Sequence, residues 1–94
     1  MTTMQEISDR VAPILKSAGA KRASIFGSYA RGEQNVNSDL DIIIDAPDGM
    51  TLFDMSGLLN ELEDTLGIKV DLITYGGVHP RIEPYISKDA VVIF

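Results

Sequence analysis

Apolar residues recur at helical spacing in the first part of the chain. Between residues 3 and 18 the apolar positions lie three and four residues apart, and this predicts an amphipathic helix. The positions of this stripe are Ile7, Val11, Ile14, Leu15 and Ala18. Pro13 lies inside the stretch, and because proline removes a backbone donor and clashes with the preceding turn, a kink or break is expected near residues 9–12. Gly19 then ends the helix.

A second helical stripe begins after residue 51. Thr51 and Asp54 have the spacing of a capping box, in which each side chain binds the backbone amide of the other residue. The apolar stripe that follows consists of Met55, Leu58, Leu59, Leu62 and Leu66. Gly67 comes directly after the stripe, so a helix over 51–66 is predicted.

Short apolar runs at 22–26, 39–45, 68–73 and 90–94 predict strands, because turn residues separate them from the two helices. A single helical turn is expected at 29–31, and a short helix is expected in the stretch that contains Pro80 and Pro84. No repeat or linker divides the chain. These elements predict one domain over residues 1–94, with an α/β (α+β) fold in which a small mixed sheet of three to four strands has helices packed mainly on one face.

Composition narrows the classes of protein that the chain can represent. Its 94 residues are 45% hydrophobic and 23% charged, as in an ordinary globular domain, and its net charge of −6 disfavours direct binding to nucleic acid. Cysteine is absent and His79, a predicted loop residue, is the single histidine, so any bound metal would need oxygen ligands. No apolar run is long enough to span a membrane and no basic leader is visible, so a cytoplasmic protein is expected.

Residues suited to chemistry are concentrated between positions 27 and 41. Gly27 and Ser28 follow an apolar strand, and the backbone amides and the serine hydroxyl of such a turn can receive phosphate oxygens. Asp39 and Asp41 share one face of the next strand, because alternate residues of a strand point the same way. Two charges ~4 Å apart repel by about 4 kcal/mol at an effective dielectric of about 20, and a divalent cation would relieve this repulsion.

Asp71 is a third carboxylate in a hydrophobic strand. Each of these candidate residues also has a simpler interpretation. Asp39 and Asp41 could form a solvated strand edge that discourages aggregation, and Gly27 with Ser28 could be an ordinary turn.

Neighbouring polar residues leave further alternatives open. Asp71 could pair with Lys69 or Arg22 at the surface, and Asp45 is interpreted as a turn residue although it shares the strand face of the aspartate pair. Arg31 is equally consistent with a plain surface charge and with a phosphate contact, which its planar guanidinium would suit. Tyr29 and Tyr75 could stack on an adenine, although a tyrosine in a small domain is more commonly a half-buried core residue.

The spacing of these residues resembles the signature of a known superfamily. Gly27-Ser28, ten intervening residues and Asp39-Leu40-Asp41 resemble the DNA polymerase beta-like nucleotidyltransferases, and Ala30-Arg31-Gly32 with the later Asp71 is similar to their minimal nucleotidyltransferase (MNT) branch. The resemblance covers nearly the whole chain. It implies that Asp39 and Asp41 bind two Mg²⁺ ions, that Asp71 completes the metal site and orients or deprotonates the attacking hydroxyl, and that Gly27 and Ser28 hold a triphosphate.

The same resemblance implies a reaction and a partner. MNT proteins of this size resemble the antitoxins of HEPN/MNT toxin-antitoxin pairs. The expected activity is therefore transfer of AMP from ATP to a hydroxyl group, namely that of a tyrosine of a HEPN-family toxin. The chain would form an oligomer with this toxin. A binding-only antitoxin, whose acidic surface blocks the ribonuclease partner, is a competing interpretation. A third is nucleotidyl transfer to a small molecule, although such relatives usually carry an additional domain.

Overall fold

A four-stranded mixed sheet forms the centre of the molecule, and the computed structural model describes residues 3–35, 37–77 and 90–94 of it. In chain order the elements are α1 (Met4–Ser17), β1 (Arg22–Phe26), α2 (Gly27–Arg31), β2 (Leu40–Asp45), α3 (Leu52–Leu66), β3 (Val70–Thr74), the 3-10 turn η1 (Tyr75–Gly77) and β4 (Val91–Val92). His79 and the short helix expected around Pro80 and Pro84 lie outside the described residues.

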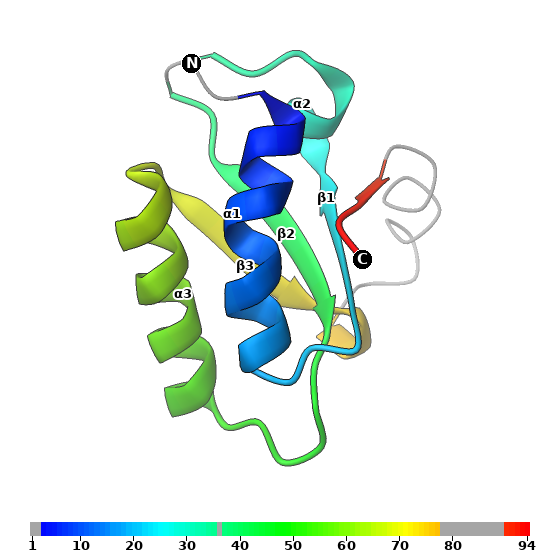
Figure 1. Ribbon diagram of the computed structural model, residues 1–94, viewed down its shortest axis with the longest axis vertical. Coiled ribbons are helices and arrows are strands. Elements are labelled where there is room, and N and C mark those ends of the chain that lie inside the picture. The colour runs from blue at the N-terminus through cyan, green and yellow to red at the C-terminus, as the bar shows by residue number, and fades with distance from the viewer. Residues whose placement is uncertain (1–2, 36, 78–89) are drawn as a thin grey trace.

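The strands are arranged in the order β3-β2-β1-β4. β1 pairs antiparallel with both β2 and β4, whereas β2 and β3 are parallel and are connected through α3. The helices α1 and α3 lie side by side on one face of the sheet (Figure 1). The predicted mixed sheet with helices on one face is therefore confirmed.

Helix α1 begins at a side-chain cap and remains unbroken to Ser17. The Thr3 hydroxyl accepts a hydrogen bond of 3.1 Å from the Glu6 amide at its start, and the buried stripe consists of Ile7, Val11 and Leu15. The prediction of a kink or break near residues 9–12 was wrong as far as a break is concerned, because the helix is continuous through Pro13. Pro13 faces solvent, and the burial of Val11 and Leu15 on either side of it holds the helix together across the missing hydrogen bond.

Helix α3 shows the capping box that its sequence predicts. The Asp54 amide donates to the Thr51 hydroxyl at 3.1 Å, and the Thr51 amide donates to the Asp54 carboxylate at 3.0 Å. The helix ends at Gly67, whose φ of +69° lies in the left-handed region that favours glycine. Leu58 and Leu62 are buried between this helix and the rest of the core.

The two faces of the sheet differ in what they carry. Leu40, Ile42 and Ile44 of β2 belong to the core that α1 and α3 cover. Because alternate residues of a strand point to opposite faces, Asp41 and Ile43 point to the face away from these helices. Ile43 is nevertheless only 1% exposed, so β2 is buried on both faces along its apolar run.

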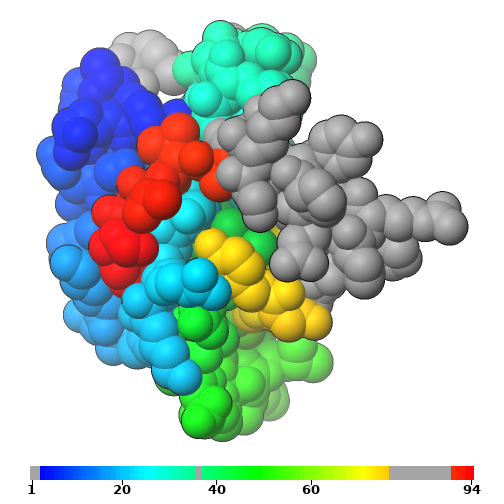
Figure 2. Space-filling model, turned by 90° about the vertical axis from the view of Figure 1, so that its right-hand side faces the viewer, coloured from blue at the N-terminus to red at the C-terminus, as the bar shows by residue number. Residues whose placement is uncertain are grey.

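Strand boundaries differ slightly from the prediction. β2 begins at Leu40, one residue later than expected, and β3 begins at Val70. The Val70 amide donates to a Glu63 carboxylate oxygen at 2.9 Å, so α3 sets the start of β3 and residues 68 and 69 form the connection. β4 is shorter than predicted, and residues 90–94 lie against α1 and β1 (Figure 2), where the Ala23 amide donates to the Phe94 carbonyl at 3.1 Å.

Candidate active site

Asp41 is the central residue of the candidate site. In the sheet it pairs with Phe26, the last residue of β1, on one side and with Asp71 of β3 on the other. Paired residues of neighbouring strands point to the same face, so the Asp41 and Asp71 carboxylates lie side by side on the face away from the helices. Asp41 is half-buried and Asp71 is exposed. The structure therefore brings together two of the three predicted carboxylates by strand pairing alone.

Gly27 packs directly against the Asp41 carboxylate. It is the first residue of α2 and has a φ of +73°, a conformation that other residues rarely adopt. A Cβ atom built on Gly27 would overlap the Asp41 Oδ2 atom and lie 3.1 Å from Asp41 Cγ. Glycine is thus required here both for its backbone conformation and for the space that the carboxylate occupies.

Three neighbouring charges act on Asp41. Burial is the largest cause that raises its pKa, and the negative charges of Asp71 and Asp39 raise it further, from the ordinary 3.8 to about 6. The guanidinium of Arg31 acts in the opposite direction on this pKa. Both charges thus disfavour the ionised form of Asp41, and Asp71 raises its pKa more than Asp39 does.

The aspartates form an edge of negative charge and do not form a closed metal cage. Within residues 3–35, 37–77 and 90–94, no three acidic or histidine side chains are already placed to hold one metal ion together. This arrangement suits Mg²⁺, which usually takes one or two carboxylates and completes its shell with waters and substrate phosphates. The oxygen donors and the raised pKa of Asp41 both fit a divalent cation, which would favour the charged form of each carboxylate.

Helix α2 places Ser28 and Arg31 beside this edge. Its N-cap residue is Phe26, which makes no side-chain hydrogen bond to the helix amides, so these first amides have no cap from a side chain. Ser28 follows Gly27 and is half-buried. Arg31 is near enough to affect Asp41 and also approaches Glu33, with 3.4 Å between Arg31 Nε and Glu33 Oε2.

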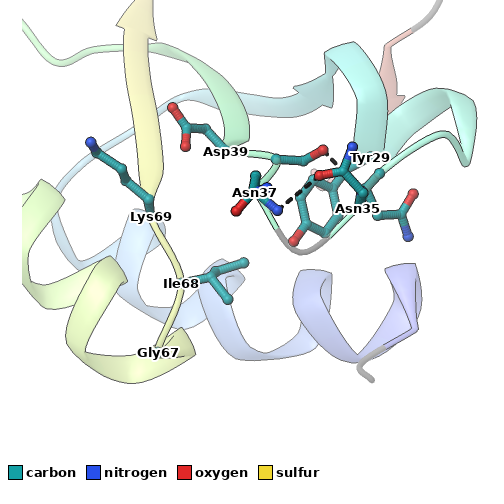
Figure 3. Close-up of a pocket in the computed structure, with 9 residues that line it drawn as sticks. Tyr29, Asn35, Asn37, Asp39, Gly67, Ile68 and Lys69 are labelled. Atoms are coloured by element: carbon teal, nitrogen blue, oxygen red, sulfur yellow. Dashed lines mark hydrogen bonds between the residues drawn. The ribbon is translucent and has the colours of Figure 1, made fainter.

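A cavity of about 820 Å³ opens next to Asp39, between the 34–39 loop and the turn that connects α3 to β3. Figure 3 shows the Asp39 carboxylate and the Lys69 side chain extending to the same side, whereas Ile68 projects toward the part of the cavity that Tyr29 lines. Sequence reasoning treated Lys69 only as a partner for Asp71 and missed its place beside Asp39. The signal was available, because Lys69 lies two residues before Asp71, as Asp39 lies two residues before Asp41.

Several polar and aromatic residues near the motif have other roles. Arg22 pairs with Asp45, with 3.6 Å between Arg22 Nε and Asp45 Oδ2, so it is the partner of Asp45 and not of Asp71. Asp45 is the last residue of β2 and not a turn residue, which corrects the prediction. The Arg22 guanidinium also lies 4.5 Å from the centre of the Tyr75 ring, and Tyr29 is 6% exposed in the core.

Comparisons with known proteins agree with this geometry. The nucleotidyltransferase domain model matches residues 8–93, so the chain belongs to the nucleotidyltransferase domain family. A Methanocaldococcus jannaschii protein named as a protein adenylyltransferase, MJ0435, is 47% identical over 94% of this chain and 95% of its own length. The protein adenylyltransferase MntA of Thermococcus cleftensis is 30% identical over 99% of this chain and 98% of its own length.

Solved structures place the chain in the minimal branch of this family. A protein described as a minimal nucleotidyltransferase is 35% identical, with a TM-score of 0.84 over 95% of this chain and 91% of that chain. A toxin-antitoxin crystallised with AMP-PNP has a TM-score of 0.82 and 22% identity over 93% of this chain and 72% of that chain. An MNT antitoxin bound to a tri-AMPylated HEPN toxin of Shewanella oneidensis has a TM-score of 0.76 and 18% identity over 96% of this chain and 71% of that chain, so these two show the fold alone.

The lengths of the helices bear on whether the chain could span a membrane. In the described residues, no helix is long and apolar enough to cross a membrane.

Proposed function

We propose that this chain transfers AMP from ATP to a hydroxyl of a partner protein, a tyrosine of a HEPN-family toxin, and acts as the antitoxin of that pair. The observation that carries the proposal is the contact between Gly27 and Asp41. This contact joins the turn at Gly27 and Ser28, which is suited to phosphate, with the central carboxylate of the aspartate edge. A triphosphate bound at the turn would therefore lie next to the aspartates proposed to carry out the transfer. The relatives named as protein adenylyltransferases support the choice of AMP and of a protein acceptor.

In the proposed reaction the acceptor oxygen attacks the α-phosphorus of ATP. The new bond joins that oxygen to phosphorus, the bond from phosphorus to the bridging oxygen breaks, and pyrophosphate leaves with the bonding electrons. The α2 amides and the Ser28 hydroxyl would hold phosphate oxygens, and Arg31 would add a positive charge beside them. Asp71 would orient the acceptor hydroxyl and receive its proton, because it is the exposed carboxylate of the pair.

Magnesium fits this edge as the proposed cofactor. Asp39, Asp41 and Asp71 would hold two Mg²⁺ ions together with phosphate oxygens and water, and the ions would supply positive charge for the entering and leaving oxygens. The pairing of Asp41 with Asp71, which puts two carboxylates side by side on one face of the sheet, supports this assignment.

The partner is inferred from the structures of similar fold. One of those structures is a toxin-antitoxin with AMP-PNP, and another holds a tri-AMPylated HEPN toxin in complex with an MNT antitoxin. The chain's net charge of −6 also favours a partner with a basic surface.

The direct test is a transfer assay with a candidate HEPN-family partner of this chain. Purified chain, partner, ATP and Mg²⁺ are combined, and intact-mass spectrometry followed by peptide mapping locates added AMP. We expect AMP on a partner tyrosine, none with the Asp41→Asn variant, and none after that tyrosine is changed to phenylalanine. A partner that is fully inhibited without gaining mass would instead support the binding-only antitoxin, and AMP on a small hydroxyl compound alone would support small-molecule transfer.

A further inference from the structure

A groove of about 500 Å³ lies at the end of the molecule opposite the aspartates. It is bounded by the last turn of α1, the 47–50 turn and the first turns of α3. Figure 1 shows α2 and the start of β2 at one end of the molecule and these three segments at the other. β2 has 6 residues, so at ~3.3 Å per residue the groove lies about 20 Å from the catalytic edge.

Two large apolar side chains are exposed at this end without serving the fold. Leu52 is 86% exposed and Phe53 is 91% exposed. They occupy the first turn of α3, whose start is already satisfied by the hydrogen bonds between Thr51 and Asp54. Polar residues at positions 52 and 53 would leave the capping box and the buried helix stripe intact, so the fold does not explain this apolar pair.

Phe53 lines the groove together with other apolar side chains. Ile14 and Ala18 line it from α1, and Met50 and Leu58 line it from the opposite side. Single apolar residues at a surface are ordinary, whereas several apolar side chains in one hollow, with an exposed aromatic side chain among them, are typical of an interaction site.

The charged residues that line the groove all have the same sign. They are Asp48, Asp54 and Glu61, and no lysine or arginine of the part of the chain that the structure describes lines the groove. A partner with flanking positive charges would therefore be attracted, whereas a second copy of this chain would bring the same acidic residues against them. The last turn of α1 and the first turns of α3 form two of its walls, and a hollow between helices is a setting for helix-in-groove recognition.

We propose that this groove docks an amphipathic helix of a partner protein, with an apolar side chain packed against Phe53 and Met50 and with lysine or arginine residues facing Asp48 and Glu61. The docking site is separate from the aspartate edge and does not depend on AMP transfer. It would hold a protein partner while leaving the catalytic edge open, which raises the local concentration of any acceptor that the same partner carries.

The first test uses a fluorescent helical peptide of leucine and lysine at amphipathic spacing, titrated against the whole chain and followed by anisotropy. We expect saturable binding that shifts the backbone amide resonances of Met50 and Leu58 and leaves those of Gly27 and Asp41 unchanged. The same peptide with glutamate in place of every lysine should not bind. Shifts centred on the aspartate edge would overturn the proposal.

Variants then separate the groove from general attraction between opposite charges. Phe53→Gln, which keeps a good helix former, should weaken binding at least tenfold, whereas Val92→Thr, which alters an apolar residue 69% exposed on β4, should change it less than twofold. Asp48→Asn with Glu61→Gln should weaken binding more than Asp9→Asn with Asp64→Asn, a control that removes the same charge elsewhere.

Equal effects from the two charge pairs would overturn the proposal, as would full binding by Phe53→Gln. If Phe53→Gln melts early, Met50→Gln provides the same test on the other apolar side chain that the proposal places in the contact. Sedimentation of the parent chain gives the last outcome, because a dimer that Phe53→Gln converts to monomer would assign the groove to a second copy and not to a basic helix.

Discussion

Gly27 and Asp41 are in direct contact, so the turn at the end of β1 and the central carboxylate of β2 form one structural unit. The contact requires that position 27 have no side chain, because a Cβ atom would overlap Asp41 Oδ2. A change at Gly27 is therefore expected to act on the carboxylate edge as well as on the turn.

Gly27→Ala should abolish AMP transfer and greatly reduce stabilisation by ATP with Mg²⁺. The φ of +73° is unfavourable for alanine, and the added methyl group displaces the Asp41 carboxylate. Thermal melts with and without ATP and Mg²⁺ provide the measurement. Gly57→Ala is the matched control, because a Cβ there meets nothing within 4 Å and the helix should gain about 0.5 kcal/mol or more. A normal ligand-dependent shift in Gly27→Ala would contradict the assigned site.

Asp39→Asn should abolish the rise in melting temperature that ATP with Mg²⁺ produces in the parent chain. A ligand that binds only the folded state stabilises it by mass action, and at a concentration about 100 times Kd the gain is about 2.7 kcal/mol. The comparison is a melt of parent and variant with the nucleotide and metal added separately and together. If a variant with all three aspartates changed to asparagine binds as tightly as the parent, the assignment of Asp39, Asp41 and Asp71 is wrong.

Asp41→Asn should stabilise the chain in metal-free buffer by about 0.5 to 2 kcal/mol, because it removes a partly buried charge from between two others. With Mg²⁺ and ATP the order should reverse, since the parent alone gains the full stabilisation by ligand. Urea unfolding in chelator and in Mg²⁺ with ATP measures both values. A variant that is less stable than the parent in chelator would mean that Asp41 mainly accepts structural hydrogen bonds.

Metal-free stability should also depend on pH through Asp41. Its pKa is about 6 in the folded chain against an ordinary 3.8, so the folded state binds the proton more tightly than the unfolded state. The contribution of this group is then most favourable below about pH 4, and the free energy of unfolding falls as the pH rises through 6, by about 1 kcal/mol once solvent screening is allowed for. Asp41→Asn should remove this part of the slope in urea melts from pH 4 to 7, and an unchanged slope would show that the pKa is not raised.

Arg31→Gln should raise KM for ATP several-fold and should raise the pKa of Asp41 further. Arg31 is the positive charge that opposes the raised pKa, and it lies on the helix proposed to receive the phosphates. Steady-state kinetics of transfer and the pH dependence of urea melts give the two readouts. Arg22→Gln is the control, since Arg22 pairs with Asp45 at the other end of β2. Equal effects from both variants would indicate a loss of general charge and no specific role for Arg31.

The sequence by itself determined the parts of the fold that depend on neighbouring residues. The stripe of Ile7, Val11 and Leu15 and the capping box of Thr51 with Asp54 were both confirmed, because a helix face and a helix cap are set by residues within one or two turns. The same holds for β1, whose predicted bounds of 22–26 match the structure. The prediction failed at Pro13, where tertiary burial outweighed a local preference against the helix.

Only the tertiary structure decided which residues meet. The register that sets Asp41 between Phe26 and Asp71, the contact of Gly27 with Asp41, and the place of Lys69 beside Asp39 all join segments that are far apart in the chain or separated by a loop. Periodicity predicts which face of a strand a side chain occupies, but a shift of one residue in pairing changes every neighbour across the sheet. That register follows from packing the whole core at once, with α3 fixing the start of β3 through Glu63 and Val70.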